Sequence, residues 1–149
     1  VDEHSLHTDG AGAGEYRGGS GAVRVYRSMN ENQTFTASFG RNKWPVWGAA
    51  GGKDGSVNYF QFIDADGTVS EPMGIAARRV MNTNDVVRMV TATGGGYGNP
   101  FKRPAEKVAM DVKNEYITVE QAKADYGVLV DPETFKVLGL TEERQKAEK

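Results

Sequence analysis

The 149-residue chain contains no cysteine, which excludes disulfide bonds, a thiolate nucleophile and a zinc site built from cysteine ligands. It also lacks any apolar run near the roughly 20 residues that a membrane-spanning helix needs. No signal-peptide pattern opens the sequence, so we expect a soluble cytoplasmic protein with no membrane partner. Histidine is scarce, and the two residues present limit any histidine-based catalysis or metal binding to themselves.

The chain has almost no net charge, because 18 basic side chains are offset by 20 acidic ones. Such a balance gives no broad basic surface for phosphate backbones, so we expect no nucleic-acid partner. The hydrophobic fraction is 38%, and 19 residues are glycine, which contributes little to burial. So small an apolar core indicates a chain that completes its core by packing against a partner, rather than a free-standing domain. The aromatic residues expected at that interface are Trp44, Trp47, Tyr59, Phe60 and Phe62.

The first two thirds of the sequence have the pattern of antiparallel β structure. Residues 34–39 alternate strictly, which places Phe35, Ala37 and Phe39 on one face of a half-buried strand. Runs of β-branched and aromatic residues bounded by turn residues predict the other strands. The strands expected are 22–29, 34–39, 57–63, 68–71 and 86–93.

The apolar period changes to that of a helix after Pro104. This proline stands at a plausible first helical position, and Val108 and Val112 belong to an apolar stripe at helical spacing. A second helix is predicted to begin at Thr118, which forms a capping box with Gln121. Glycine is favoured just after a helix, and Gly127 ends the second helix.

The last segment, 141–149, is polar nearly all round, with acidic residues early and basic residues late. These charges suit a helix dipole, but the segment has little to bury. We expect it to fray or to dock on another surface.

These patterns predict one α+β domain over residues 1–149. It is divided into a glycine-rich N-terminal segment (1–21), a β-rich part (22–93) and a helical C-terminal part (104–149). Mainly antiparallel β structure fills residues 20–93, short helices follow, and the fold is completed by packing on a larger subunit.

Two glycine-rich segments, 10–21 and 94–98, are the strongest candidates for function. A dinucleotide fingerprint needs a strand before it and a helix after it, whereas polar residues precede the first segment and a strand follows it. No Walker-type lysine follows either segment, so we expect no nucleotide site in this chain. Consecutive glycines can form a nest of N–H groups that binds an anion, or a tight turn that packs against a larger subunit. The candidate ligand or interface contacts are Gly94, Gly95, Gly96 and Tyr97, followed by Arg17 beside Gly18.

Other chemistry-bearing residues give weaker signals, and no catalytic residue is predicted. His4 and His7 are weak metal-ligand candidates, because the first residues of a chain are usually loose, and we expect no metal here. The sequence of residues 64–67 resembles the start of a calcium loop, but Ile75 stands where the loop needs a glutamate, so a hairpin turn is predicted. Arg78 and Arg79 form either an anion-binding pair or an ordinary solvated pair.

Two long stretches carry a resemblance to a known family. The stretch HTDGAGAGEYRGGSGAVRVYR (7–27) resembles the opening of the last part of B-type subunits in the hydantoinase/oxoprolinase family. The stretch NDVVRMVTATGGGYGNPFKRPAEKVAMDVKNEYITVEQAKADYGVLVD (84–131) resembles the C-terminus of those subunits. The motifs occur in the same order and frame nearly the whole chain.

The resemblance implies a place in a multisubunit enzyme. Family members include ATP-dependent hydantoinases, 5-oxoprolinases and the acetone and acetophenone carboxylases. They pair an A-type subunit that binds ATP with a B-type subunit several times longer than this chain. By resemblance we expect a small, non-catalytic structural subunit of an acetophenone carboxylase-like complex, which converts acetophenone to benzoylacetate with bicarbonate and ATP. ATP and a divalent metal are expected elsewhere in the complex, and no cofactor is expected in this chain.

The sequence leaves two alternatives to the carboxylase hypothesis open. The same module would suit an ATP-dependent hydantoinase or oxoprolinase, in which a cyclic amide is opened. An independent β-rich binding module is the third hypothesis.

Overall fold

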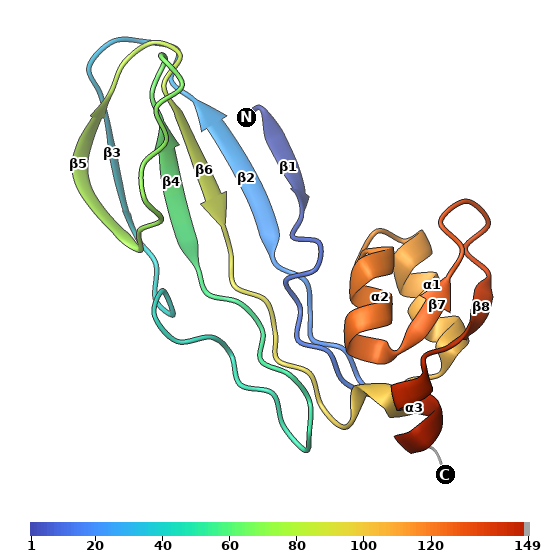
Figure 1. Cartoon of the computed structure of the whole chain (residues 1–149). Helices are drawn as coiled ribbons and strands as arrows, with labels where there is room; N and C mark the ends of the chain where they lie inside the picture. Colours follow the sequence, from blue (N-terminus) through green and yellow to red (C-terminus); the bar gives the residue numbers. More distant parts are fainter. Residues whose placement is uncertain (148–149) are drawn as a thin grey trace.

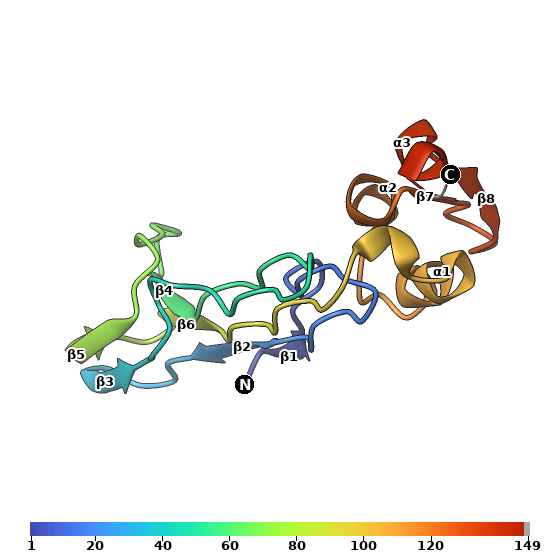
Figure 2. The same ribbon diagram turned by 90° about the horizontal axis from the view of Figure 1, so that it is seen from below.

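The computed structural model describes residues 1–147 and is elongated, with the main strands at one end and the helices at the other (Figures 1 and 2). Mainly antiparallel strands and three short α-helices confirm the predicted α+β class. The elements in chain order are β1 (Glu3–Leu6), β2 (Ala22–Arg27), β3 (Gln33–Ser38), β4 (Tyr59–Ile63), β5 (Ile75–Met81), β6 (Val86–Val90), the 3-10 helix η1 (Pro100–Lys102), α1 (Ala105–Lys113), α2 (Val119–Tyr126), β7 (Val128–Val130), β8 (Val137–Leu140) and α3 (Glu142–Ala147).

The main sheet has four antiparallel strands in the order β1-β2-β6-β4. After β4 the chain turns at Gly67 and runs back along the outer side of β4, where Val69 and Met73 form isolated bridges. The predicted hairpin turn at residues 64–67 is confirmed by the hydrogen bond from the Gly67 N–H to the Asp64 carbonyl at 2.8 Å. β1 forms the opposite edge of the sheet.

β3 and β5 form a separate two-stranded arm that packs on the sheet (Figure 1). The alternation predicted for residues 34–39 is confirmed, because Phe35, Ala37 and Phe39 all contact the buried cluster around Phe60 and Phe62. The rings of Phe35 and Phe62 meet edge to face with 5.4 Å between their centroids. Phe60 and Phe62 therefore belong to the chain's own core and not to an outer interface as predicted, while Trp44 and Trp47 are exposed.

The strands depart from the prediction at three places. The first is β5, which was not predicted, because two adjacent arginines interrupt its apolar pattern and Arg78 adopts a φ of 52° at a bulge opposite Thr36. The strand predicted at 68–71 forms only an isolated bridge. The third departure is β1, a strand that was not predicted within the glycine-rich N-terminal segment.

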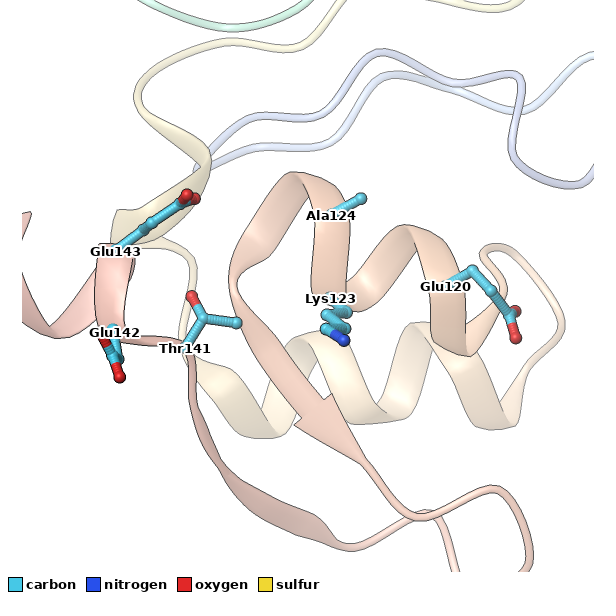
Figure 3. Close-up of a pocket in the computed structure, with 6 residues that line it drawn as sticks. All are labelled: Glu120, Lys123, Ala124, Thr141, Glu142 and Glu143. Atoms are coloured by element: carbon cyan, nitrogen blue, oxygen red, sulfur yellow. The ribbon is translucent and has the colours of Figure 1, made fainter.

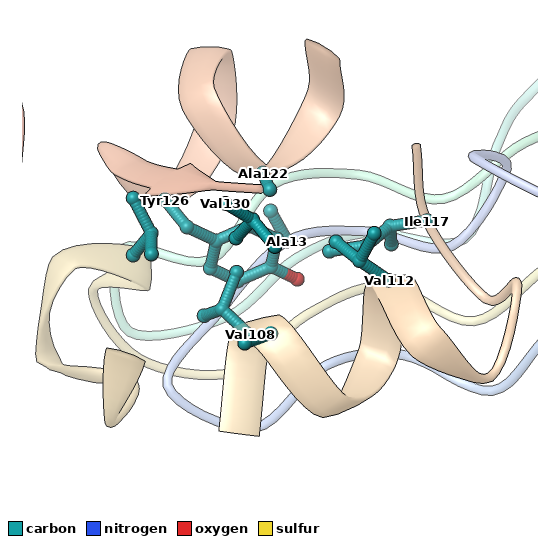
Figure 4. Packing of buried hydrophobic residues seen from close by; sticks show 9 residues of the cluster. Ala13, Val108, Val112, Ile117, Ala122, Tyr126 and Val130 are labelled. Atoms are coloured by element: carbon teal, nitrogen blue, oxygen red, sulfur yellow. The ribbon is translucent and has the colours of Figure 1, made fainter. Parts of the chain in front are cut away.

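The helical part surrounds a second buried cluster, in which the Tyr126 ring lies between Val108 and Ala122 (Figure 4). The predicted start of α2 is confirmed, because the Thr118 hydroxyl accepts a hydrogen bond from the Gln121 N–H at 3.1 Å. Gly127 ends the helix with a φ of 63°, as predicted. Residues from the helices, β7 and the N-terminal segment share this cluster: Ala13, Val108, Ala109, Val112, Ile117, Ala122, Tyr126, Val128 and Val130.

α3 docks on the chain itself through one buried side chain. Arg144 is 4% exposed and donates hydrogen bonds to the carbonyl oxygens of Tyr126 at 3.0 Å and Arg103 at 2.9 Å. The prediction that this segment frays or docks elsewhere is therefore wrong for residues 142–147. The last two positions of the predicted helical part, 148 and 149, lie outside the described residues.

Candidate functional site

Three extended segments run side by side between the sheet and the helices (Figure 1). They are residues 10–21, 46–56 and 92–98, and we refer to them together as the glycine junction. Both glycine runs singled out in the sequence lie in it, and the segment that carries Gly48, Gly51 and Gly52 completes it. No pattern in the sequence indicates that this third segment joins the other two.

The glycines of the junction are required by close backbone packing. A Cβ atom on Gly18, Gly52 or Gly96 would lie well under 3.0 Å from a backbone carbonyl of a neighbouring segment. Real Cβ atoms do not approach a carbonyl so closely, and only glycine lacks this atom. The close approach predicted from the glycine runs is thus present, but the surface approached is the chain's own backbone.

Four of the five backbone N–H groups in the run at residues 94–98 are already used. They donate hydrogen bonds of 2.9 Å to carbonyl oxygens of the other two segments. A nest binds an anion only with free N–H groups, so these four form no nest. The bonds run from Gly94 to Gly19, Gly96 to Lys53, Tyr97 to Tyr16 and Gly98 to Ala49.

Arg17 is held inside the chain. Its side chain is 13% exposed, and its guanidinium lies over the Tyr116 ring, 4.7 Å from the ring centroid. It donates a hydrogen bond to the Gly18 carbonyl at 3.1 Å, and its Nε lies 3.6 Å from a carboxylate oxygen of Asp111. The charge of Arg17 is therefore compensated by α1.

Asp111 connects α1 to the glycine junction through a second arginine. Asp111 is 7% exposed, and its Oδ2 accepts a hydrogen bond from Arg103 Nε at 3.0 Å and forms an ion pair with an Arg103 terminal nitrogen at 2.9 Å. Arg103 also donates to the Glu15 carbonyl, at 3.0 Å. One carboxylate thus lies between two largely buried guanidinium groups, an arrangement that fixes the helix to the junction.

Tyr97 is the one predicted candidate whose side chain faces outward. It is 57% exposed and pairs with Tyr16, which is 64% exposed, at 6.3 Å between ring centroids. The two backbones exchange hydrogen bonds of 2.9 and 3.0 Å, so the rings project from a fixed base. Exposed aromatic pairs on a rigid base are typical contacts of protein interfaces, and this role for Tyr97 stays a prediction.

The histidines do not come together with other ligands. His4 is exposed on β1 and accepts a hydrogen bond from Arg24 at 3.4 Å, whereas the His7 ring lies beside Gly10. Within residues 1–147, no three His, Cys, Asp or Glu side chains are grouped so that they could hold a metal ion.

Arg79 forms an ion pair with Asp64 at 2.9 Å and lies 5.1 Å from the Phe62 ring centroid. Its guanidinium thus has a partner within the chain, while the neighbouring Arg78 is exposed.

A hollow of about 520 Å³ lies between α2 and the start of α3. Its carboxylates come from Glu120 on α2 and from Glu142 and Glu143 on α3, and they do not converge on one point (Figure 3). Lys123 borders the same hollow and reduces its negative charge. The hollow therefore has the character of a solvated surface depression.

Burial raises the pKa of Tyr126 to about 12. Its side chain is fully buried, and its hydroxyl has no hydrogen-bond partner among the described residues. Asp66 and Asp131 have pKa values below the usual range, because each carboxylate accepts hydrogen bonds from backbone N–H groups of its own turn. The shifted pKa of Tyr126 thus comes from its place in the core, and those of Asp66 and Asp131 come from turns.

The sequence profile of hydantoinase B/oxoprolinase matches residues 1–100, about two thirds of the chain. The chain belongs to this family. It is 31% identical over 147 residues to the caprolactamase β chain of Pseudomonas jessenii, covering 88% of this chain and 23% of that one. It is 30% identical over 132 residues to the B-type chain of a putative D-/L-hydantoinase from a Pseudomonas strain, covering 87% and 22%.

Two solved structures share the fold of this hydantoinase B-type module. The ATP-dependent caprolactamase of Pseudomonas jessenii matches with a TM-score of 0.76 and 29% identity, over 99% of this chain and 25% of that one. Nucleotide-free acetone carboxylase matches with a TM-score of 0.73 and 18% identity, over 97% and 23%. The chain thus spans about a quarter of the length of these proteins. None of its described helices is long and apolar enough to cross a membrane.

Proposed function

We propose that this chain is a small, non-catalytic structural subunit of an ATP-dependent enzyme complex. The glycine junction carries the proposal: four of the five N–H donors at residues 94–98, and the Arg17 side chain, are bonded within the chain. Such a site holds segments in place and offers little to a substrate. ATP-dependent carboxylation needs a phosphate clamp, metal-held phosphates and oxyanion donors, which we assign to other subunits.

The partners proposed are a larger B-type subunit, which carries the rest of the fold, and an A-type subunit, which binds ATP and a divalent metal. The coverage of about a quarter of each relative supports the first partner. The exposed Tyr16–Tyr97 pair is a suitable contact for either.

The reaction proposed for the complex is carboxylation of an aryl ketone, acetophenone to benzoylacetate, with bicarbonate and ATP. The family resemblance and the fold shared with acetone carboxylase support it. ATP-dependent opening of a cyclic amide is the second candidate. The identities of 30% and 31% to the hydantoinase and caprolactamase chains favour this second reaction, since the carboxylase match is 18% identical.

Purification through a tag on this chain tests both the role and the reaction. The expected result is co-purification of longer A-type and B-type chains, and a complex that makes benzoylacetate from acetophenone, labelled bicarbonate and ATP. ATP hydrolysis that requires hydantoin or caprolactam, and no bicarbonate, would replace the carboxylase with an amide hydrolase. A stable monomer with a sharp unfolding transition and no bound partner would contradict the subunit role and favour an independent binding module.

A further inference from the structure

One face of the main sheet is covered over β4 and β6 and open over β2 and β1. Directly opposed residues of antiparallel strands share a face. The register therefore places four side chains from the four strands in one row: His4, Arg24, Met89 and Phe60. Phe60 is fully buried, Met89 is half-buried, and the other two are exposed. Burial thus decreases across this face from β4 to β1.

The neighbouring row on the same face repeats this gradient. Phe62 and Val87 are buried, whereas Tyr26 on β2 is only half-buried. The cause is the position of the β3–β5 arm, which lays Phe35 and Ala76 on the buried cluster and ends before β1. The arm therefore covers the part of this face over β4 and β6 and leaves open the part over β2 and β1, which carries Tyr26, Arg24 and His4.

An open groove of about 590 Å³ lies where this cover ends. Its apolar wall contains two methionines and two aromatic side chains, which adapt readily to another apolar surface. The polar side chains at one end of the groove already have partners within the chain. Arg27 forms an ion pair with Asp2 at 2.8 Å, and the Ser28 hydroxyl donates a hydrogen bond of 2.8 Å to the Gln33 side-chain oxygen. The apolar lining is Tyr26, Phe35, Met81, Val87 and Met89.

We propose that this groove holds an apolar segment of the larger B-type polypeptide, from the portion of the fold that this chain lacks. The inference rests on the proposed function, because it needs that polypeptide as the partner. The chain spans 22% and 23% of its relatives' length, so most of the B-type fold lies outside it. An apolar groove that continues a buried cluster and is rimmed by polar residues is typical of an interaction surface.

The rim of the groove adds a requirement on the partner's charge. Arg24 is exposed in the row beside Met89 and, among residues 1–147, has no carboxylate partner; its one side-chain bond runs to His4. A cation at the edge of an interface favours an opposite charge on the other side. The segment that fits is therefore apolar, with an acidic side chain next to it.

A photo-crosslinking amino acid in place of Tyr26 tests the contact within the tagged complex. The matched control replaces Val80, which is 53% exposed on β5 and does not line the groove. We expect the Tyr26 variant to crosslink to the larger B-type chain, with mass spectrometry locating the site at an apolar segment, and the Val80 variant to give at least fivefold less of that product.

The possible failures are distinguishable. If the wild-type chain co-purifies without any larger B-type chain, the proposed function fails and the groove inference fails with it. If the complex forms but Tyr26 crosslinks to a second copy of this chain, to the A-type subunit or to nothing, the groove inference is wrong and the subunit role stands.

A charge reversal gives an independent check on the rim. Arg24→Glu changes an exposed side chain, so the fold is retained, and we expect at least a fivefold loss of B-type chain recovered at low salt. Arg78→Glu makes the same change at an exposed arginine outside the groove and should leave recovery unchanged. Equal recovery with both variants would contradict the charge requirement.

Discussion

The glycine junction and the helical core both join segments far apart in the sequence, but by different physical means. In the helical core, Val108, Ile117 and Tyr126 are at most 2% exposed and pack side chain against side chain. In the junction, backbone meets backbone through hydrogen bonds such as Gly94 to Gly19 at 2.9 Å, with no room for a Cβ atom.

This difference determines how each region responds to change. A packed core loses stability in proportion to the volume removed, because neighbours relax only in part. A backbone-to-backbone junction has no side-chain volume to remove, and at its tightly packed glycines, such as Gly18, Gly52 and Gly96, an added Cβ atom collides with a backbone carbonyl. The stability of the helical core should therefore fall gradually as carbon atoms are removed. A single added methyl group at a tightly packed glycine of the junction should be enough to prevent folding.

The largest effect is expected at Gly18. Gly18→Ala places a methyl group against the Gly94 carbonyl, and we expect a loss of at least about 4 kcal/mol in unfolding free energy, or no folded protein. At its neighbour Gly19, a methyl group would have nothing within 4 Å and the φ is not positive, so Gly19→Ala should change stability by less than about 0.5 kcal/mol. Chemical denaturation of both variants measures this. Similar losses for the two variants would show that the collision with the Gly94 carbonyl is not what makes Gly18 intolerant of a side chain.

The link between the regions should give the next largest effect. Asp111→Asn leaves Arg17 and Arg103, each 13% exposed, without their carboxylate. We expect a loss of about 3 kcal/mol, since an uncompensated buried charge is costly. The control is Asp64→Asn in the half-exposed pair with Arg79, which should cost less than about 1 kcal/mol. Equal effects in urea unfolding would show that Asp111 does not fix α1 to the junction.

The helical core should show a graded response. Ile117 is 2% exposed within it. We expect Ile117→Val to cost about 1 kcal/mol and Ile117→Ala about 3 kcal/mol, because the cavity grows with each carbon removed. Thermal and denaturant unfolding measure both. A loss with Ile117→Val as large as with Gly18→Ala would contradict the proposed difference in tolerance.

The smallest effect at neutral pH is expected at Tyr126. Its hydroxyl has no partner among residues 1–147, so Tyr126→Phe should change stability by less than about 1 kcal/mol at pH 7 despite full burial. The native pKa is about 12 against 10.0 for the free side chain, so the folded state keeps its proton longer. The wild-type stability present below pH 10 should therefore fall by about 1.4 kcal/mol per pH unit as the pH rises toward 12.

The Phe variant should lack this alkaline component. Stability measured at pH 7, 10 and 11.5 compares them. Parallel curves for wild type and variant would show that the Tyr126 proton is not retained on burial.

Local features were predictable from the sequence. The alternation at 34–39, the cap at Thr118 and the end of α2 at Gly127 depend on residues within one strand or one turn, and all three are confirmed. The seven-residue strand β5 escaped prediction, because Arg78 and Arg79 stand where an apolar pattern would be.

The glycine junction was predictable only in part. Consecutive glycines indicate close approach, but glycine has no side chain whose period reveals what is approached. Hence the sequence pointed to an anion or a larger subunit, whereas the structure places the segment around Lys53 against Gly96. The burial of Arg17 against Tyr116 was equally hidden, because nothing local connects two residues so far apart.

Amide hydrogen exchange at Gly94, Gly96, Tyr97 and Gly98 tests most directly the claim that the junction is structural. We expect exchange as slow as in β6 for all four amides, unchanged by added inorganic phosphate or ATP, because each N–H is bonded to a carbonyl of the same chain. Rapid exchange that slows when phosphate is added would contradict it and would make the glycine run an anion site.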